Sequence, residues 1–232
     1  GSVAFGDGTP GSDYTDTSAL TTSGVTVTAA RKVVNIPVDD LVAMSTGEAN
    51  DIIATVGKAV GIAAATKFDS DVMALFASLT NTMTGVTTTG NKTTAASFRK
   101  YGTALRADNV PGPYCAVFHP NGYEDFLSES SSPLLSVAAS GDVASKVWAD
   151  YYMGSMFGTK IFAHSGVPAD STTDFIGGYF SPHAIGVAWK RDVTIEAQRD
   201  ASAGWTEYVA DMYYGVGVID ANAGCKMLQD YS

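Results

Sequence analysis

The feature that most constrains the fold is a long amphipathic segment that begins near residue 45. Apolar side chains recur every three or four positions from Ile52 to Leu79, a spacing that places them on one face of an α-helix. Ser45 and Glu48 have the spacing of a capping box, which predicts the helix start. A continuous helix here would be roughly 50 Å long at about 1.5 Å per residue, although Asp69-Ser70-Asp71 offers a point where a second helix restarts.

The side chains expected to pack this helix lie on its apolar face and include two glycines. Gly57 and Gly61 are four residues apart, and each costs about 1 kcal/mol relative to alanine inside a helix. We therefore expect them to allow close backbone packing in a tight core crossing. The predicted packing set is Ile52, Val56, Gly57, Val60, Gly61, Phe68, Val72 and Phe76.

The residues before the helix predict a β-rich arm. Residues 1–24 are rich in Gly, Ser, Thr and Asp, so we expect a neighbouring chain to order them. Apolar and polar residues then alternate in two short runs separated by Arg31-Lys32, as in strand segments of a protruding hairpin. These two cations either meet acidic surfaces of another copy or stay solvated. The candidate interface residues are Val25, Val27, Arg31, Lys32, Val34 and Ile36.

The second half of the chain predicts mixed α/β structure that ends in sheet. A break at Pro111-Gly112-Pro113 precedes a short apolar run at 114–118, which is typical of a central strand. Capping residues predict helices that begin near Asn121 and Ser140. Further strand patterns occupy 160–163, 175–180, 193–198 and 208–218, with a turn at 200–204 and with Gly215 and Gly217 suited to a bend or a close backbone approach.

Composition limits the function classes. The net charge of −10 disfavours sequence-independent binding to phosphates, which relies on clustered Lys and Arg. No apolar run approaches the length of a membrane span. Cys115 and Cys225 are the only cysteines, and their apolar surroundings predict buried reduced thiols in a reducing cytoplasm rather than a disulfide framework.

An enzyme is the competing hypothesis. Cys115, His119 and Asp125 suggest a thiol hydrolase, but residues four apart on a strand are separated by roughly 13 Å, too far for a hydrogen bond. We therefore expect His119 to position a strand-to-helix turn, and we predict no catalytic residue.

Metal and cofactor sites are also not predicted. His164 and His183 lack the paired spacing of zinc ligands. Asp7, Asp13 and Asp16 lie outside any calcium-loop pattern, and Gly215-Val-Gly217 lacks the third glycine of a dinucleotide loop.

Three segments together resemble the major capsid proteins of tailed bacteriophages. They are the β-arm followed by the long helix, the run Gly-Pro-Tyr-Cys-Ala-Val-Phe-His-Pro at 112–120, and the closing stretch from Ile195-Glu-Ala-Gln-Arg-Asp200 to Tyr214-Gly-Val-Gly-Val218. The likeness covers most of the chain from about Val25 onward. It implies the Hong Kong ninety-seven-like coat fold, an α+β fold with a β-rich extended arm, a peripheral domain with a long spine helix, and an axial α/β domain.

The resemblance also implies a domain division and a set of partners. Residues 1–44 would form the N-terminal arm and extended β-loop, 45–110 the peripheral domain, 111–175 the axial domain, and 176–232 closing strands shared by both domains. The subunits would assemble into pentamers and hexamers of an icosahedral shell around double-stranded DNA, without sequence-specific contact to it or to a membrane. Scaffold, portal and decoration proteins are further implied partners, in the virion capsid and, during assembly, in the host cytoplasm.

Some members of this family join subunits by a Lys-to-Asn isopeptide bond. Lys32 is the only arm lysine, and no motif identifies a partner asparagine, so we expect noncovalent assembly.

Two other functions fit parts of the sequence pattern. An encapsulin-like nanocompartment shell would share the fold but enclose a cargo enzyme, and a monomeric β-rich module of a phage tail or fibre would lack the long helix.

Overall fold

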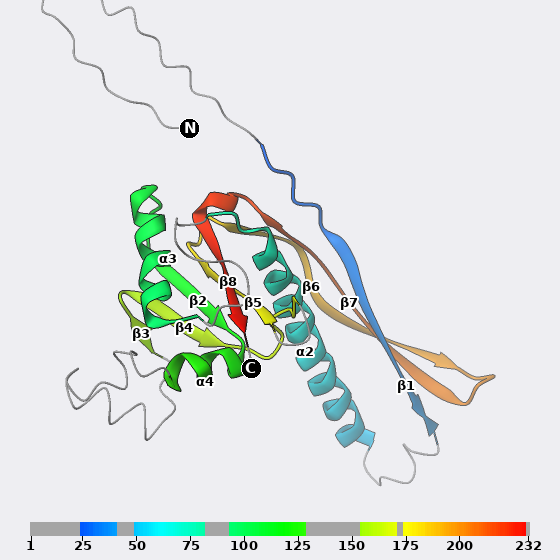
Figure 1. Ribbon diagram of the computed structural model, residues 1–232. Coiled ribbons are helices and arrows are strands. Elements are labelled where there is room, and N and C mark those ends of the chain that lie inside the picture. Colours follow the sequence, from blue (N-terminus) through cyan, green and yellow to red (C-terminus); the bar gives the residue numbers. More distant parts are fainter. Residues whose placement is uncertain (1–23, 41–48, 82–92, 129–153, 171–173, 231–232) are drawn as a thin grey trace, which may run out of the picture.

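The computed structural model describes residues 24–40, 49–81, 93–128, 154–170 and 174–230 (Figure 1). These residues form a body built on a five-stranded sheet and an arm built on a three-stranded sheet. The arm extends away from the body alongside the long helix α2, Ala49–Met73 (Figure 1). Within the described residues, no helix is both long and apolar enough to cross a membrane.

The body sheet has the strand order β3-β4-β2-β5-β8, so the apolar run at 114–118 is a central strand, as predicted. β2 and β4 are parallel, and the other pairs are antiparallel. The strands are β2 (Tyr114–Phe118), β3 (Ser155–Met156), β4 (Thr159–Ala163), β5 (Asp174–Phe180) and β8 (Gly224–Asp230).

Two helices cover one face of this sheet. α3 (Ala95–Ala107) begins with a capping box in which Thr94 and Ser97 each accept a hydrogen bond from the other's backbone N–H, which satisfies two otherwise unpaired donors. α4 (Pro120–Ser128) follows the strand-to-helix turn at His119. A core of aromatic side chains, including Phe98 and Phe126, fills the layer between helices and sheet.

The other face of the sheet receives the end of the long helix. After Met73 the chain tightens into a 3-10 turn over Ala74–Ser78, and the ring of Phe76 packs directly on β5. At Gly178 an added Cβ would lie only 2.7 Å from that ring, so the glycine makes the close approach possible. The end of the long helix and the 3-10 turn after it thus join the arm to the body through the buried side chains of Met73, Phe76 and Leu79.

The arm sheet has the order β1-β7-β6, with both pairs antiparallel. β1 spans Ala30–Asp39, β6 Ile185–Asp200 and β7 Trp205–Val218. The predicted turn at 200–204 connects β6 and β7: the Asp200 carboxylate accepts hydrogen bonds from Ser202 and Ala203, and Gly204 has φ of 73°.

The structure corrects two details of the predicted arm and helix. The first predicted strand segment, at 25–29, is not a strand; β1 begins at Ala30, runs continuously through Arg31 and Lys32, and pairs with β7 instead of forming a hairpin of its own. Both cations have carboxylate partners in the folded chain. The long helix also does not restart at Asp69, since α2 continues to Met73. Its predicted start at Ser45 and the helix expected near Ser140 lie outside the described residues.

Gly215 and Gly217 do allow a close backbone approach, as predicted. The carbonyl oxygen of Thr28 would lie 2.3 Å from a Cβ at Gly215, and Val27 lies against Gly217. The segment before β1 therefore approaches β7 closely at Gly215 and Gly217, the two positions where β7 has no side chain. The division of the chain into four domains stays a prediction.

Candidate subunit interface

One face of the arm sheet packs on α2. The pairing register places Val34, Ala210 and Ile195 side by side on this face. Val56 and Val60 of α2 bury Ala210 there, and Val34, Ile36, Val38 and Tyr208 pack around them. The helix therefore anchors the arm along β1 and β7, the two strands that it covers.

A single carboxylate ties the base of the arm to the helix. Asp71 of α2 accepts hydrogen bonds from Lys67 Nζ (2.6 Å) and from the Tyr214 hydroxyl of β7 (2.8 Å). Lys32 Nζ of β1 lies 3.4 Å from the same group. Burial raises the pKa of Asp71, but the Lys67 and Tyr214 hydrogen bonds and the Lys32 charge together lower it below its usual value.

The same joint contains an aromatic cluster. Phe68 of α2 stacks on Trp189 of β6 with ring centroids 5.2 Å apart, and it meets Tyr214 edge-on at 5.4 Å. Burial, together with the hydrogen bond to Asp71, raises the pKa of Tyr214 well above its usual value, so the hydroxyl stays protonated and continues to donate. We refer to Asp71, Lys32, Lys67, Tyr214, Phe68 and Trp189 as the arm joint.

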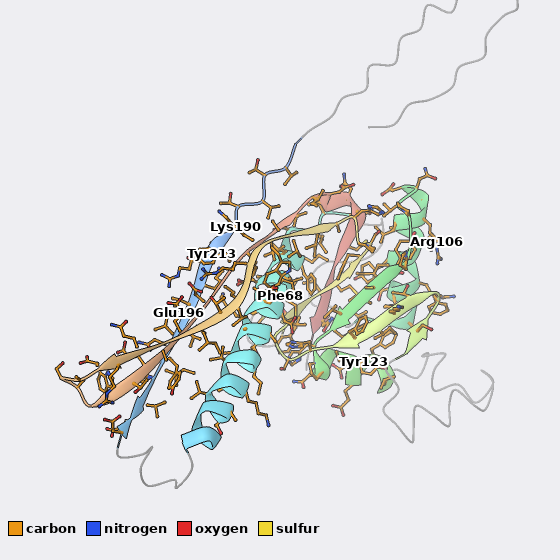
Figure 2. The ribbon with its side chains drawn as sticks, turned by 180° about the vertical axis from the view of Figure 1, so that it is seen from behind. Phe68, Arg106, Tyr123, Lys190, Glu196 and Tyr213 are labelled. Carbon is orange, nitrogen blue, oxygen red and sulfur yellow. The ribbon has the colours of Figure 1, made fainter. Side chains whose placement is uncertain are left out.

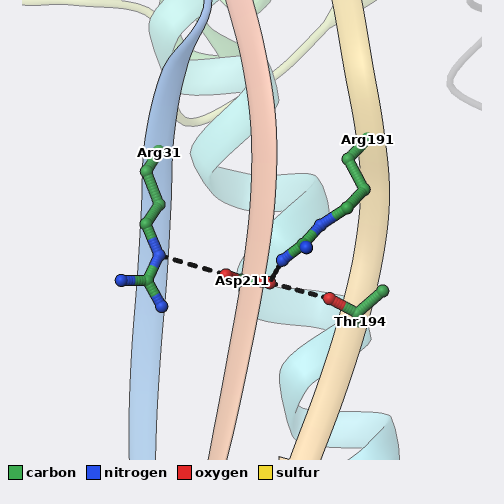
Figure 3. Close-up of polar contacts among 4 residues, drawn as sticks. All are labelled: Arg31, Arg191, Thr194 and Asp211. Atoms are coloured by element: carbon green, nitrogen blue, oxygen red, sulfur yellow. Dashed lines mark hydrogen bonds and ion pairs between the residues drawn. The ribbon is translucent and has the colours of Figure 1, made fainter.

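The opposite face of the arm carries a second carboxylate that links all three strands (Figure 3). Asp211 of β7 accepts hydrogen bonds from Arg31 Nε of β1 (3.0 Å) and Thr194 Oγ1 of β6 (2.7 Å), and it pairs with Arg191 of β6. The Thr194 hydrogen bond and those of the two arginines hold the pKa of Asp211 below its usual range, against the effect of burial. This cluster lies where the β6 register shifts between Trp189, Arg191 and Thr194.

Large apolar side chains remain exposed along the arm. The exposed fraction is 59% for Val33, 51% for Trp189, 46% for Ile195 and 40% for Val193. Ile195 and Trp189 belong to the face that packs on α2, because they pair with Ala210 and Tyr214. Ile195 is exposed because this part of β6 lies beyond the strands that the helix covers, whereas Trp189 is half exposed although its ring stacks on Phe68 of α2. The arm therefore leaves apolar side chains partly uncovered along β6, and Val33 of β1 is exposed on the opposite face of the sheet.

The six arm residues predicted to contact a neighbour have different surroundings. Val25 is 51% exposed, and Arg31 is half exposed despite its pair with Asp211. Lys32 belongs to the arm joint, while Val34 and Ile36 pack toward α2. Contact of these six residues with a neighbouring subunit stays a prediction. The sequence did not single out Val33, Trp189, Val193 or Ile195 as contacts, although the alternation in 193–198 predicted the strand that holds Val193 and Ile195.

The predicted packing set of the long helix is brought together only in part. Val56, Val60 and Phe76 are buried, Phe68 enters the arm joint, and Val72 is half-buried. The expectation for Gly57 and Gly61 is wrong within the chain: an added Cβ at either position meets nothing within 4 Å. These glycines lie on a side of α2 that no described element of the chain covers. Ile52 lies in α2, but its side chain is outside the described part.

The contacts of the residues considered for catalysis indicate structural roles. The His119 ring stacks on Phe175 with centroids 3.6 Å apart, and its Nδ1 accepts a hydrogen bond from the Asn121 backbone; burial lowers its pKa. Cys115 lies half-buried on β2, and burial raises the pKa of the Cys225 thiol to about 12. Among the residues described, no cluster of three His, Cys, Asp or Glu side chains is placed to hold a metal; Asp7, Asp13 and Asp16 lie outside them.

Comparisons with known proteins identify this architecture. Neither the protein-family models nor the curated proteins contain a match to the sequence. Among solved structures, a chain of Mycobacterium phage Che8 matches with a TM-score of 0.70 and 21% identity, over 85% of this chain and 70% of that one. The capsid structure of Cyanophage P-SCSP1u matches with a TM-score of 0.69 and 17% identity, over 100% of this chain and 82% of that one.

An encapsulin shell is also similar, although less so. The holo-SrpI encapsulin complex from Synechococcus elongatus matches with a TM-score of 0.57 and 12% identity, over 89% of this chain and 75% of that one. The chain therefore has the Hong Kong ninety-seven-like coat fold that its sequence resemblance implied.

Proposed function

We propose that this chain, which has the coat fold of tailed-phage capsids, is a major capsid protein. In this role it has a structural and not a catalytic function. Copies assemble into pentamers and hexamers of an icosahedral shell that encloses double-stranded DNA. Its place is the virion capsid, after assembly in the host cytoplasm with scaffold, portal and decoration proteins as partners.

The observation that carries this proposal is the uncovered arm. Three strands project beside α2, and Val33, Trp189, Val193 and Ile195 remain substantially exposed on them (Figure 2 shows the hairpin side of the arm). Completing the burial of a half-exposed apolar side chain of this size is worth about 1 kcal/mol. Because such contacts repeat between many copies, their summed free energy of burial is large. In an isolated subunit the same apolar surface is exposed to water, which is unfavourable.

The charge of the chain agrees with a container for nucleic acid. A wall with a net charge of −10 per subunit repels phosphates rather than binding them in a fixed arrangement.

Contacts around five-fold and six-fold rings are heterologous, so the same two patches of each subunit meet all the way round. The arm is the element best placed to provide one of these patches.

An encapsulin-like nanocompartment is the second candidate, supported by the match to the encapsulin complex. The phage capsid match of Cyanophage P-SCSP1u has a higher TM-score than this encapsulin match, 0.69 against 0.57, which favours the capsid. A monomeric tail or fibre module is disfavoured by the long helix and the coat fold.

Electron microscopy of the purified chain, together with light-scattering mass and absorbance at nucleic-acid wavelengths, tests the proposal. We expect uniform closed shells. Shells that contain DNA when isolated from infected cells support the capsid, whereas shells filled with a single protein cargo support the nanocompartment. A chain that stays monomeric when mixed with its scaffold protein would refute both shell functions.

A further inference from the structure

A cavity of about 270 Å³ lies between α2 and the arm sheet and opens to the outside. Alanine occupies three positions of its wall, Ala63 and Ala64 on α2 and Ala210 on β7. These small side chains leave a gap between the two places where helix and sheet touch, the Val60 contact and the arm joint. Because a cavity of about 150 Å³ already holds a benzene ring, this one has room for an aromatic side chain.

The rim of this cavity carries an excess of positive charge. Arg31, Lys32 and Lys67 line it together with one carboxylate, Asp211. Lys32 and Lys67 share the carboxylate of Asp71, and Arg31 shares Asp211 with a second arginine, so each carboxylate faces two cations. The side chains of the three lining cations are 31% to 53% exposed. An apolar cavity with such a rim favours an apolar side chain that has a carboxylate beside it.

Residues 1–23 have this chemistry. They contain three aspartates and no Lys, Arg or His. Tyr14 is followed two positions later by Asp16, and in an extended chain such residues point to the same side, about 7 Å apart. Phe5 also has an aspartate two positions later, but Tyr14 has a second carboxylate, Asp13, next to it. Tyr14 can therefore enter the cavity while Asp16 reaches the lysines on its rim.

The chain before β1 leaves on the opposite face of its own arm sheet. Tyr214 of β7 points toward α2, to which its hydroxyl donates a hydrogen bond, so the next residue, Gly215, faces the other way. Thr28 lies against Gly215 and is therefore on that outer face. Figure 1 shows the chain before β1 leading away from the turn at 200–204. The sheet thus lies between the attachment point of residues 1–23 and the cavity of the same subunit, which favours the cavity of another copy.

We infer that Tyr14 of one copy docks in the cavity between α2 and the arm sheet of a second copy, with Asp16 beside Lys32 and Lys67. Docking covers Val193, which lines the cavity and is 40% exposed. The inference rests on the proposed shell function, and it names the site that the N-terminal segment occupies on a neighbouring subunit.

Photo-crosslinking in assembled particles of the full chain tests the docking. Tyr14→p-azidophenylalanine keeps the aromatic ring and, on irradiation, forms bonds to the groups that the ring touches. We expect a covalent dimer on a denaturing gel, in which residue 14 is joined to the stretch 60–67 or 210–212 of the second copy. Phe5→p-azidophenylalanine is the matched control, and it should give no crosslink to these stretches.

The charge of the rim has its own test. In the chain with the photo-crosslinker at position 14, Asp16→Asn should lower the yield of covalent dimer by about 1.5-fold to 5-fold, the effect of one partly exposed ion pair. Asp7→Asn removes the same charge away from Tyr14 and should leave the yield unchanged. Equal losses from both substitutions would overturn the pairing of Asp16 with the rim.

The outcomes separate the docking from the shell function. Intact particles in which residue 14 reaches neither stretch, or in which residue 5 reaches them instead, would overturn Tyr14 as the docked residue and leave the shell function standing. A crosslink to the cavity within one chain, which runs as a monomer, would overturn the second copy as the partner. Failure of the unsubstituted chain to form particles with its scaffold would overturn the shell function, and the docking between copies with it.

Discussion

Replacing the helix glycines with alanine gives the sharpest test of the long helix. At Gly57 and Gly61 an added methyl group meets no atom within 4 Å, and both residues lie in the interior of α2. Each substitution removes the helix penalty of glycine without creating a clash, so it should stabilise the unassembled chain by about 1 kcal/mol.

Urea unfolding of the unassembled chain, followed by circular dichroism, measures this effect. With a slope of about 1–3 kcal/mol per molar urea, a gain of about 1 kcal/mol moves the midpoint upward by about 0.3–1 M. Gly178→Ala is the matched control, because its Cβ would lie 2.7 Å from the Phe76 ring; its midpoint should fall. A fall at Gly57→Ala or Gly61→Ala as well would mean that these glycines pack closely within the chain, and the reasoning would be refuted.

Three further predictions concern the arm. Because the folded-state pKa of Asp71 is lowered, its contribution to stability is present at neutral pH and is lost as the pH falls below the unfolded value of about 3.9. Urea unfolding of Asp71→Asn should therefore show a free energy of unfolding lower by on the order of 1–2 kcal/mol at neutral pH. In acid this difference from the unsubstituted chain should disappear. Gly215→Val places a side chain where the Thr28 carbonyl lies, so thermal unfolding should show a destabilisation of about 1–3 kcal/mol. The control is Thr66→Val at an exposed position of α2, which should destabilise the chain by less than about 1 kcal/mol. Deleting residues 1–24 should reduce particle yield in light scattering while the urea midpoint of the monomer stays unchanged; equal yield from the truncated chain would contradict a role of this segment in assembly.

Much of the fold follows from local patterns in the sequence. The periodicity after Ile52 predicted α2, the alternation in 208–218 predicted β7, and the break before Tyr114 predicted a central strand; the structure confirms each. α2 and β7 are predictable because the pattern of each reflects one buried face, and the central strand because its continuous apolar run reflects apolar neighbours on both faces.

The exposed apolar residues of the arm were less predictable because exposure depends on which strands a helix covers. The alternation at Val193 and Ile195 indicates a half-buried strand, and nothing local shows that α2 stops short of it. Likewise, the Asp211 cluster joins Arg31 and Arg191 across three strands, and each residue alone resembles a solvated charge. The prediction of close packing at Gly57 and Gly61 was wrong because this spacing is the same in a helix that crosses a neighbour closely and in one whose face is uncovered.

The arm joint has a consequence for the geometry of a shell. Asp71 of α2 holds β1 through Lys32 and β7 through Tyr214, and every copy of the chain carries the same arrangement. A substitution that tilts the arm by a small angle is therefore repeated in every subunit with the same sign. In the proposed shell this repeated tilt would change the curvature, so we expect a damaged joint to alter the particle diameter more than the particle yield.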